Sequence, residues 1–125
     1  MASNPTHAEL VQAVRDFIAN TARPVLTGHA AFHARVAENA LAIVERELMD
    51  GERADAAAIR RLQVLLDSTE SDRDVLERLL CTQIRSGKLS WKSPELMAHL
   101  KSSTIDQVRI DQPKYSGLAI ATESD

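Results

Sequence analysis

The stretch GHAAFHARVAENALAIVEREL, residues 28–48, decides the fold, because its apolar residues recur with the period of an α-helix. At 100° per residue these side chains cover about half of the helix surface, which is broader than the stripe of an ordinary surface helix. We therefore expect a long central helix that packs against neighbours on two sides and ends near Gly51. The apolar arc comprises Phe32, Val36, Ala37, Ala40, Leu41, Ile43, Val44 and Leu48.

Two polar residues of this helix, His33 and Glu47, fall inside the apolar arc. A buried imidazole needs a hydrogen-bond partner, and a buried carboxylate needs a cation or donors. In one interpretation both residues line a pocket. In the other, which we favour for each, His33 is a core histidine bonded to a neighbouring carbonyl and Glu47 snorkels toward solvent near the helix end. They lie about 21 Å apart along the helix axis at 1.5 Å per residue, so they do not form one catalytic pair.

Arg35, Asn39 and Arg46 form a polar line along one border of the same helix. Such a line could bind a carboxylate, a phosphate or the acidic edge of a partner. The two arginines could equally pair with Glu38, Glu45 or acids of neighbouring helices, and we favour this structural role. Together with His33 and Glu47, these three residues are the candidate ligand-binding or partner-binding residues.

Capping signals place the other helices along the chain. Thr6 and Glu9 form a capping box that begins a helix to about Thr21. After the central helix and a short acidic link, we expect a third helix over residues 54–66 and a fourth, capped by Ser71, to about Arg85. Ser93-Pro94-Glu95 begins a fifth helix, which runs to near Asp111 and could break at its serine-rich middle.

Length and composition predict an all-α protein. A chain of 125 residues is the size of one domain, and scarce glycine, proline and aromatic residues favour helices with an aliphatic core. We expect a compact bundle of five helices around the long central second helix. This bundle spans residues 1–112, and residues 113–125 form an extended or disordered C-terminal arm.

Charge and cysteine content exclude several classes of protein. The net charge of −3 and the lack of aromatic platforms argue against a nucleic-acid binder. The single cysteine, Cys81, forbids an internal disulfide and favours a reducing, cytoplasmic location. No signal peptide and no apolar run long enough to span a membrane are present, so we expect no membrane association.

No motif for catalysis, metal binding or cofactor binding is present. His29 and His33 have the i, i+4 spacing of a metal-binding pair, but a third ligand is not nearby in the sequence, and His7 or His99 would have to approach in space. Cys81 lacks a local basic partner that would activate it. Glycine-rich phosphate loops and a nucleophile elbow are absent. We therefore expect no metal, no cofactor and no enzymatic activity.

Several segments resemble the signature of a small all-helical bacterial domain of unknown function. The resemblance rests mainly on residues 32–37, 39–44 and 46–47 (FHARVA, NALAIV and RE), with Pro5-Thr6, Glu9-Leu10-Val11, Ala13-Val14-Arg15 and residues 111–115 (DQPKY) in the same pattern. It covers nearly the whole chain, from Pro5 to about Tyr115. That family is encoded beside, or fused to, aminoglycoside-phosphotransferase-like kinases and acyl-CoA dehydrogenases, whose own motifs this chain lacks.

The resemblance and the missing chemistry together favour a non-enzymatic accessory domain that binds a partner protein. The family resemblance implies that this partner is a phosphotransferase-like kinase or an acyl-CoA dehydrogenase. The alternative is a helical bundle that binds a small acyl or carboxylate ligand in a pocket near His33. A minor enzyme working through His33 or the Arg35-Asn39-Arg46 line is a third hypothesis. Exposed Val64, Trp91 and Leu118 would also permit a homo-oligomer.

Overall fold

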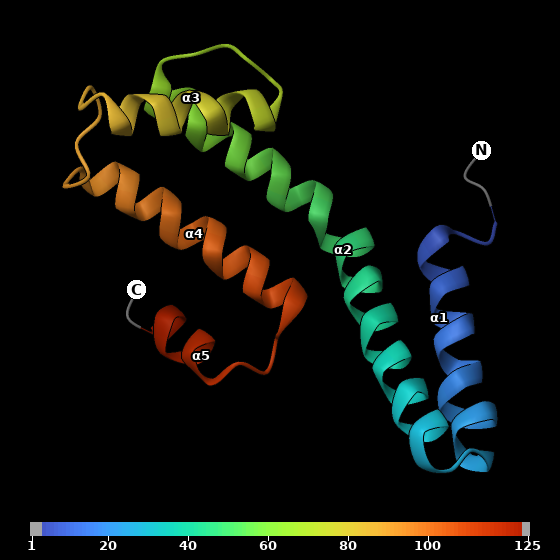
Figure 1. Ribbon diagram of the computed structural model, residues 1–125. Coiled ribbons are helices and arrows are strands. Elements are labelled where there is room, and N and C mark those ends of the chain that lie inside the picture. The colour runs from blue at the N-terminus through green and yellow to red at the C-terminus, as the bar shows by residue number, and fades with distance from the viewer. Residues whose placement is uncertain (1–3, 124–125) are drawn as a thin grey trace. The chain divides into compact units, whose positions relative to one another are not determined.

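The computed structural model describes residues 4–123, which contain five α-helices and no strand (Figure 1). The prediction of an all-α protein with five helices and a long second helix is confirmed. Within the described range, no helix combines the length and the apolar character needed to cross a bilayer. The chain divides into two compact units, residues 1–51 and residues 52–125, which are described in turn.

The first unit begins with α1, His7–Phe17, at the predicted capping box. The Thr6 hydroxyl accepts a hydrogen bond from the backbone N–H of Glu9 at 3.2 Å, and the Glu9 carboxylate accepts one from the backbone N–H of Thr6 at 3.2 Å. The helix does not stay α-helical to Thr21. It changes to a π-helical turn over Ile18–Ala22 and then to a 3-10 turn over Arg23–Val25, which places Pro24 where its missing N–H is tolerated.

Helix α2 runs without interruption from Gly28 to Leu66, so the predicted stop at Gly51 and the separate third helix are wrong. A glycine ends a helix by adopting a positive φ, and among the described glycines only Gly28 and Gly87 do so. Gly51 stays helical, and the Glu47 carboxylate folds over it: a Cβ at Gly51 would lie 2.5 Å from Glu47 Oε1.

Helix α1 and the N-terminal part of α2 form an antiparallel pair, which we call the hairpin (residues 7–50). Two ion pairs join its arms: Arg15 Nη1 lies 3.2 Å from Glu45 Oε2, and Arg23 contacts Glu38. The residue numbers rise on one arm as they fall on the other, which defines the antiparallel direction. No residue between 4 and 50 is buried, so the hairpin has no core of its own.

The side of α2 that faces α1 is the opposite of the predicted one. Glu38 and Glu45 pair with α1 and with the 3-10 turn after it, and Ala31, Ala34 and Ala42 share their half-buried face. Phe32 and Val36 of the apolar arc are 63% and 48% exposed. The expectation that this arc is buried on two sides is therefore wrong for the hairpin.

The second unit contains the C-terminal part of α2 and three further helices. Helix α2 ends at Leu66, and the φ of 50° at the following residue, Asp67, lets the Ser68 N–H donate to the Gln63 carbonyl at 3.0 Å. Helix α3, Arg73–Arg85, is capped by Asp72 and not by Ser71 as predicted. Helix α4, Pro94–Asp111, has the predicted Ser93 cap and continues unbroken through its serine-rich middle.

Helix α5, Ser116–Glu123, occupies the predicted C-terminal arm and contacts α4. The expectation of an extended or disordered arm is therefore wrong for residues 116–123, while residues 124 and 125 lie outside the described range. The Tyr115 ring lies over the Gly117 α-carbon, where any larger residue would collide with it.

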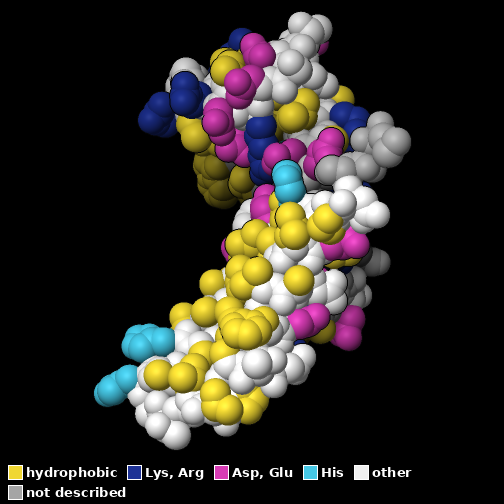
Figure 2. Space-filling model, turned by 90° about the vertical axis from the view of Figure 1, so that its right-hand side faces the viewer, with side chains coloured by type: hydrophobic (Ala, Val, Ile, Leu, Met, Phe, Trp, Pro, Cys, Tyr) yellow, Lys and Arg dark blue, Asp and Glu magenta, His cyan; other side chains and the backbone are white. Residues whose placement is uncertain are grey.

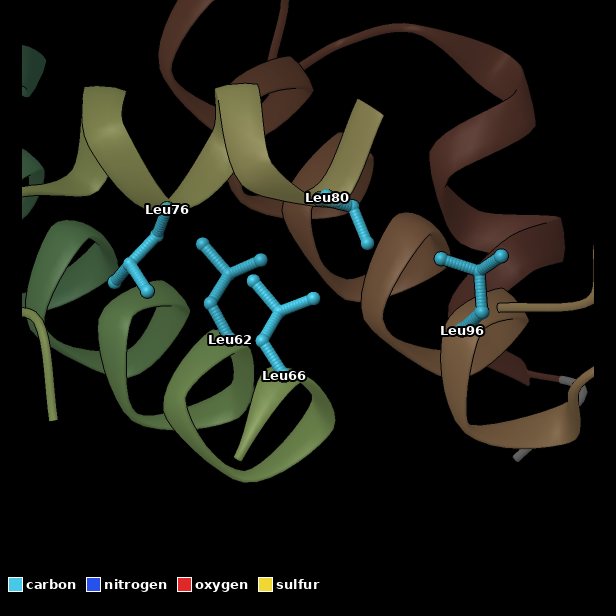
Figure 3. Packing of buried hydrophobic residues seen from close by; sticks show 5 residues of the cluster. All are labelled: Leu62, Leu66, Leu76, Leu80 and Leu96. Atoms are coloured by element: carbon cyan, nitrogen blue, oxygen red, sulfur yellow. The ribbon is translucent and has the colours of Figure 1, made fainter. Parts of the chain in front are cut away.

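The buried core of this unit is a cluster of leucines from three helices (Figure 3). The cluster brings α2, α3 and α4 together, and Ile59, Leu65, Leu79, Ile84 and Leu89 pack around it. Each fully buried leucine stabilises the fold by about 1.5–3 kcal/mol relative to an exposed one. The cluster therefore fixes how α2 and α4 approach each other and so positions the site described below. Its members are Leu62, Leu66, Leu76, Leu80 and Leu96.

Candidate ligand pocket and interaction surface

An open pocket of about 700 Å³ lies in the second unit, between the C-terminal part of α2 and α4. Its aliphatic wall comes from Val64 and Leu65 of α2, Leu89 of the loop before α4, and Ala98. Its volume is in the range of small-molecule sites, which combine apolar walls with a few oriented polar groups. The polar lining residues are Arg60, Arg61, Ser93, Glu95, His99 and Ser102. We call this the Arg60–His99 pocket.

His99 is the buried polar residue of this pocket, with 5% of its surface exposed. Arg61 Nε donates a hydrogen bond to His99 Nδ1 at 3.1 Å, and Arg61 Nη2 donates one to Ser103 Oγ at 3.1 Å. An arginine is always a donor, so Nδ1 must carry a lone pair and the imidazole is neutral with its proton on Nε2. The contact thus fixes both the tautomer of His99 and the position of the Arg61 guanidinium.

The surroundings of His99 favour the same neutral form. Burial lowers the pKa of His99 below its ordinary value of 6.5, and the positive charges of Arg61 and Arg73 lower it further. The Glu77 carboxylate opposes this shift, but Glu77 is itself bound by Arg73, whose Nε lies 2.9 Å from Glu77 Oε1. Arg73 also pairs with Asp55. His99 therefore acts as an uncharged acceptor that holds Arg61.

The arrangement suits binding better than catalysis. A general base needs a free lone pair facing a substrate, and the Nδ1 lone pair of His99 is occupied by Arg61. The Glu95 carboxylate accepts a hydrogen bond from the Ser93 hydroxyl at 3.1 Å, beside the first turn of α4. Arginine and serine donors beside an aliphatic wall can hold the polar end and the apolar body of one small molecule.

The five residues selected from the sequence lie on the N-terminal part of α2, outside this pocket. His33 and Glu47 are exposed. The expectation that His33 lies in an apolar core is therefore wrong, whereas an exposed Glu47 is compatible with a side chain that snorkels toward solvent. The His33 ring makes an edge contact with Phe32, with ring centroids 5.6 Å apart. Arg35 and Asn39 are also exposed, and Arg46 is half-buried. Whether these residues bind a ligand or a partner stays a prediction.

Sequence reasoning missed His99 and Arg61 as a pair. The apolar residues Met97 and Leu100 of α4 do not mark its buried side, because their side chains are 54% and 41% exposed. The stripe that faces the core is Leu96, His99 and Ile110, at helical spacing. Counting His99 among the buried residues of α4 would have identified the side of this helix that faces the core. Arg61, however, lies 38 residues away in the sequence, and no local pattern connects it to His99.

A second hollow lies on the surface of α3, lined by charged and polar side chains that include Cys81. Cys81 is exposed. Within residues 4–123, no group of three histidine, cysteine, aspartate or glutamate side chains is placed to hold a metal ion. This hollow has no buried polar group comparable to His99.

The hairpin provides the other candidate surface. Leu10, Val14 and Phe17 of α1 are exposed at helical spacing, and α2 exposes an apolar row at steps of four residues. We call these two lines of side chains the apolar rows. Figure 2 shows hydrophobic side chains gathered along the hairpin, in the lower part of the view. The α2 row comprises Phe32, Val36, Ala40, Val44 and Leu48.

The fold and these two surfaces define a small all-α domain with an open pocket and an apolar hairpin. A family model matches residues 24–115, which is most of the chain, and the protein therefore belongs to the family described as Domain of unknown function (DUF6285). Neither a curated protein nor a solved structure matches the chain. The expected family resemblance is thus confirmed at the level of a domain of unknown function.

Proposed function

We propose that the protein is a non-enzymatic interaction domain that binds a partner protein through the apolar rows of its hairpin. The observation that carries the proposal is which side of α2 faces α1. Its ion-pairing, alanine-rich side faces α1, and Phe32 and Val36 are left exposed. A monomeric protein rarely exposes large contiguous apolar surface unless that surface has a binding role.

The lack of a core in the hairpin supports the same conclusion. No residue between 4 and 50 is buried, and the arms are joined by two partly exposed ion pairs, each worth about 1 kcal/mol or less. Helices gain most of their stability in proteins from packing an amphipathic face. A partner that covers the apolar rows would supply that packing.

The geometry of the rows indicates a helical partner. Residues at steps of four form a ridge along one side of a helix, and such ridges pack into the grooves of another helix. Arg35 and Asn39 are exposed beside the α2 row. Arg35 has no hydrogen bond or ion pair with another described residue, so an acidic edge on the partner helix would complement it.

We further propose that the partner is a phosphotransferase-like kinase or an acyl-CoA dehydrogenase in the same cytoplasmic compartment. Support for this choice comes from the family resemblance of the residues around Phe32 and Arg46. Support for a non-enzymatic role comes from the chemistry of the Arg60–His99 pocket, where the imidazole holds an arginine.

Interferometry tests the proposal by measuring whether the purified protein binds a purified phosphotransferase-like kinase or a purified acyl-CoA dehydrogenase from the same genome. We expect one enzyme to bind and the Val36→Glu variant to bind at least about tenfold more weakly, because a charge in an apolar interface is costly. Ile120→Glu is the matched control, because Ile120 is 70% exposed and lies on α5. It should bind as the unmodified protein does.

Three results would overturn the proposal. The first is that neither enzyme binds, and the second is that Val36→Glu binds as well as the control does. The third is that sedimentation shows a dimer that Val36→Glu converts to a monomer, which would assign the apolar rows to a second copy of this chain. Circular dichroism of each variant verifies that the helices remain folded.

A further inference from the structure

We propose that the Arg60–His99 pocket binds an aliphatic monocarboxylate, with its carboxylate at Arg60 and Arg61 and its chain along the aliphatic wall. This site lies wholly within the second unit and does not depend on the hairpin. The proposal therefore goes beyond the interaction role and can succeed or fail separately.

The polar end of the pocket contains N–H donors that make no hydrogen bond within the described residues. A guanidinium has five N–H groups, and Arg61 commits two of them, one to His99 and one to Ser103. Arg60 has no hydrogen bond or ion pair with any residue in the described range. Two adjacent arginines with free donors match a carboxylate, which accepts hydrogen bonds on both oxygens.

His99 prepares Arg61 for this task. The imidazole is nine-tenths buried and holds the guanidinium from one side while Ser103 holds it from another. A long, flexible side chain otherwise loses rotamer entropy when it binds a ligand. Because Arg61 is already held, its remaining N–H groups can bind an anion without that loss. His99 is therefore a positioning residue for Arg61.

The charge of the pocket selects the class of anion. Arg60 and Arg61 contribute two positive charges, and Glu95 contributes one negative charge at the same pocket. The net charge of +1 matches a monoanion, while a phosphate dianion would meet the Glu95 carboxylate with excess negative charge. A carboxylate is thus favoured over a phosphate ester.

The aliphatic wall selects the rest of the ligand. Val64 is 84% exposed and lies one helical turn from Arg60 on α2, with Leu65 beside it. Leu89 and Ala98 continue the wall from the loop and from α4. An alkyl chain laid against these residues removes apolar surface from water on both molecules. The volume of about 700 Å³ accommodates a chain of medium length.

Calorimetric titration with octanoate, acetate, 1-octanol and octyl phosphate tests the proposal on the full chain. We expect octanoate to bind, acetate to bind too weakly to detect, and octanol and octyl phosphate to bind at least about tenfold more weakly than octanoate. The single tryptophan, Trp91, lies between Leu89 and Ser93 in sequence, so its fluorescence should change with octanoate.

Two variants localise the site. Arg60→Gln should weaken octanoate binding at least about tenfold, and Arg60 is exposed, so the fold should be retained. Arg78→Gln, an exposed arginine of α3 outside this pocket, is the control and should bind octanoate normally. Val36→Glu should also bind normally, because that residue lies on the hairpin.

The proposal is overturned if octanol or octyl phosphate binds as tightly as octanoate, or if octanoate does not bind. It is also overturned if Arg60→Gln and Arg78→Gln weaken binding equally. Loss of octanoate binding in Val36→Glu would show adsorption of the alkyl chain to the apolar rows instead of the pocket. None of these outcomes alters the test of the partner protein.

Discussion

Replacing Gly51 with alanine should stabilise the protein, and the sign of the change depends on how α2 passes this position. Gly51 has a helical backbone inside α2, so alanine gains about 1 kcal/mol of helix propensity over glycine. A Cβ at this position would lie 2.5 Å from Glu47 Oε1, so the Glu47 side chain must turn away. Glu47 is exposed, and its carboxylate can rotate into water at little cost.

We therefore expect Gly51→Ala to raise the free energy of unfolding by about 0.5–1 kcal/mol, measured by urea denaturation followed with circular dichroism. Gly87→Ala is the matched control, because Gly87 has a φ of +81°. A Cβ is disfavoured in that left-handed conformation, and the control should lose about 1 kcal/mol. A loss of stability in Gly51→Ala as large as in the control would mean that Gly51 ends a helix.

Three further predictions concern the second unit. Leu62→Ala should lower the free energy of unfolding by about 2–5 kcal/mol, because Leu62 is fully buried. Val64→Ala should change it by less than about 0.5 kcal/mol, because Val64 is exposed. Equal losses of stability in the two variants would contradict the core described here. Asp67→Gly should stabilise by about 1 kcal/mol, because Asp67 has a positive φ at the end of α2; a loss in the same denaturation assay would contradict this. Because the pKa of His99 is lowered in the folded protein, the unfolded chain binds a proton at this histidine more readily. The free energy of unfolding should therefore be highest above pH 6.5 and should fall as the pH decreases from there toward the lowered pKa. A His99→Gln variant with the same dependence of stability on pH would refute this.

Features that depend on neighbouring residues could be predicted from the sequence. The capping box at Thr6 and the N-cap at Ser93 each depend on a hydrogen bond to a residue three positions along the chain, and both are present. The all-α class follows from composition and period, which need no knowledge of tertiary contacts. The end of α4 at Asp111 was likewise predicted, since Pro113 prevents its continuation.

The errors arise where a choice depends on contacts far along the chain. Periodicity identified the apolar arc of α2 but not what the arc faces. Glu38 and Glu45 find arginines 15 and 30 residues earlier, so the polar side of α2 faces α1 instead. Gly51 was taken as a helix end by its residue type alone, although only a positive φ makes glycine a stop.

The candidate site was the least predictable feature of the protein. In the sequence, His99 and Arg61 belong to no common motif. Their bond connects residues 38 positions apart, and the leucine cluster between α2 and α4 makes it possible. Chemistry assembled by tertiary packing in this way leaves no local signature.

The two proposed surfaces lie in different units and make separate demands on the chain. In our proposals the apolar rows bind a macromolecular partner, and the Arg60–His99 pocket binds a small anion. An octanoate titration in the presence of the partner enzyme would measure any coupling between them. Binding energies that add independently would indicate two unconnected sites.

Hydroxyl-radical labelling of Phe32 in the monomeric protein, with mass-spectrometric readout, tests the central claim that α2 leaves its apolar row uncovered. Phe32 is 63% exposed, so we predict that it is labelled as fast as an exposed aromatic residue and is protected once the partner enzyme is added. Leu76, which is fully buried, provides the protected reference in the same digest. A monomer in which Phe32 is as protected as Leu76 would contradict the account.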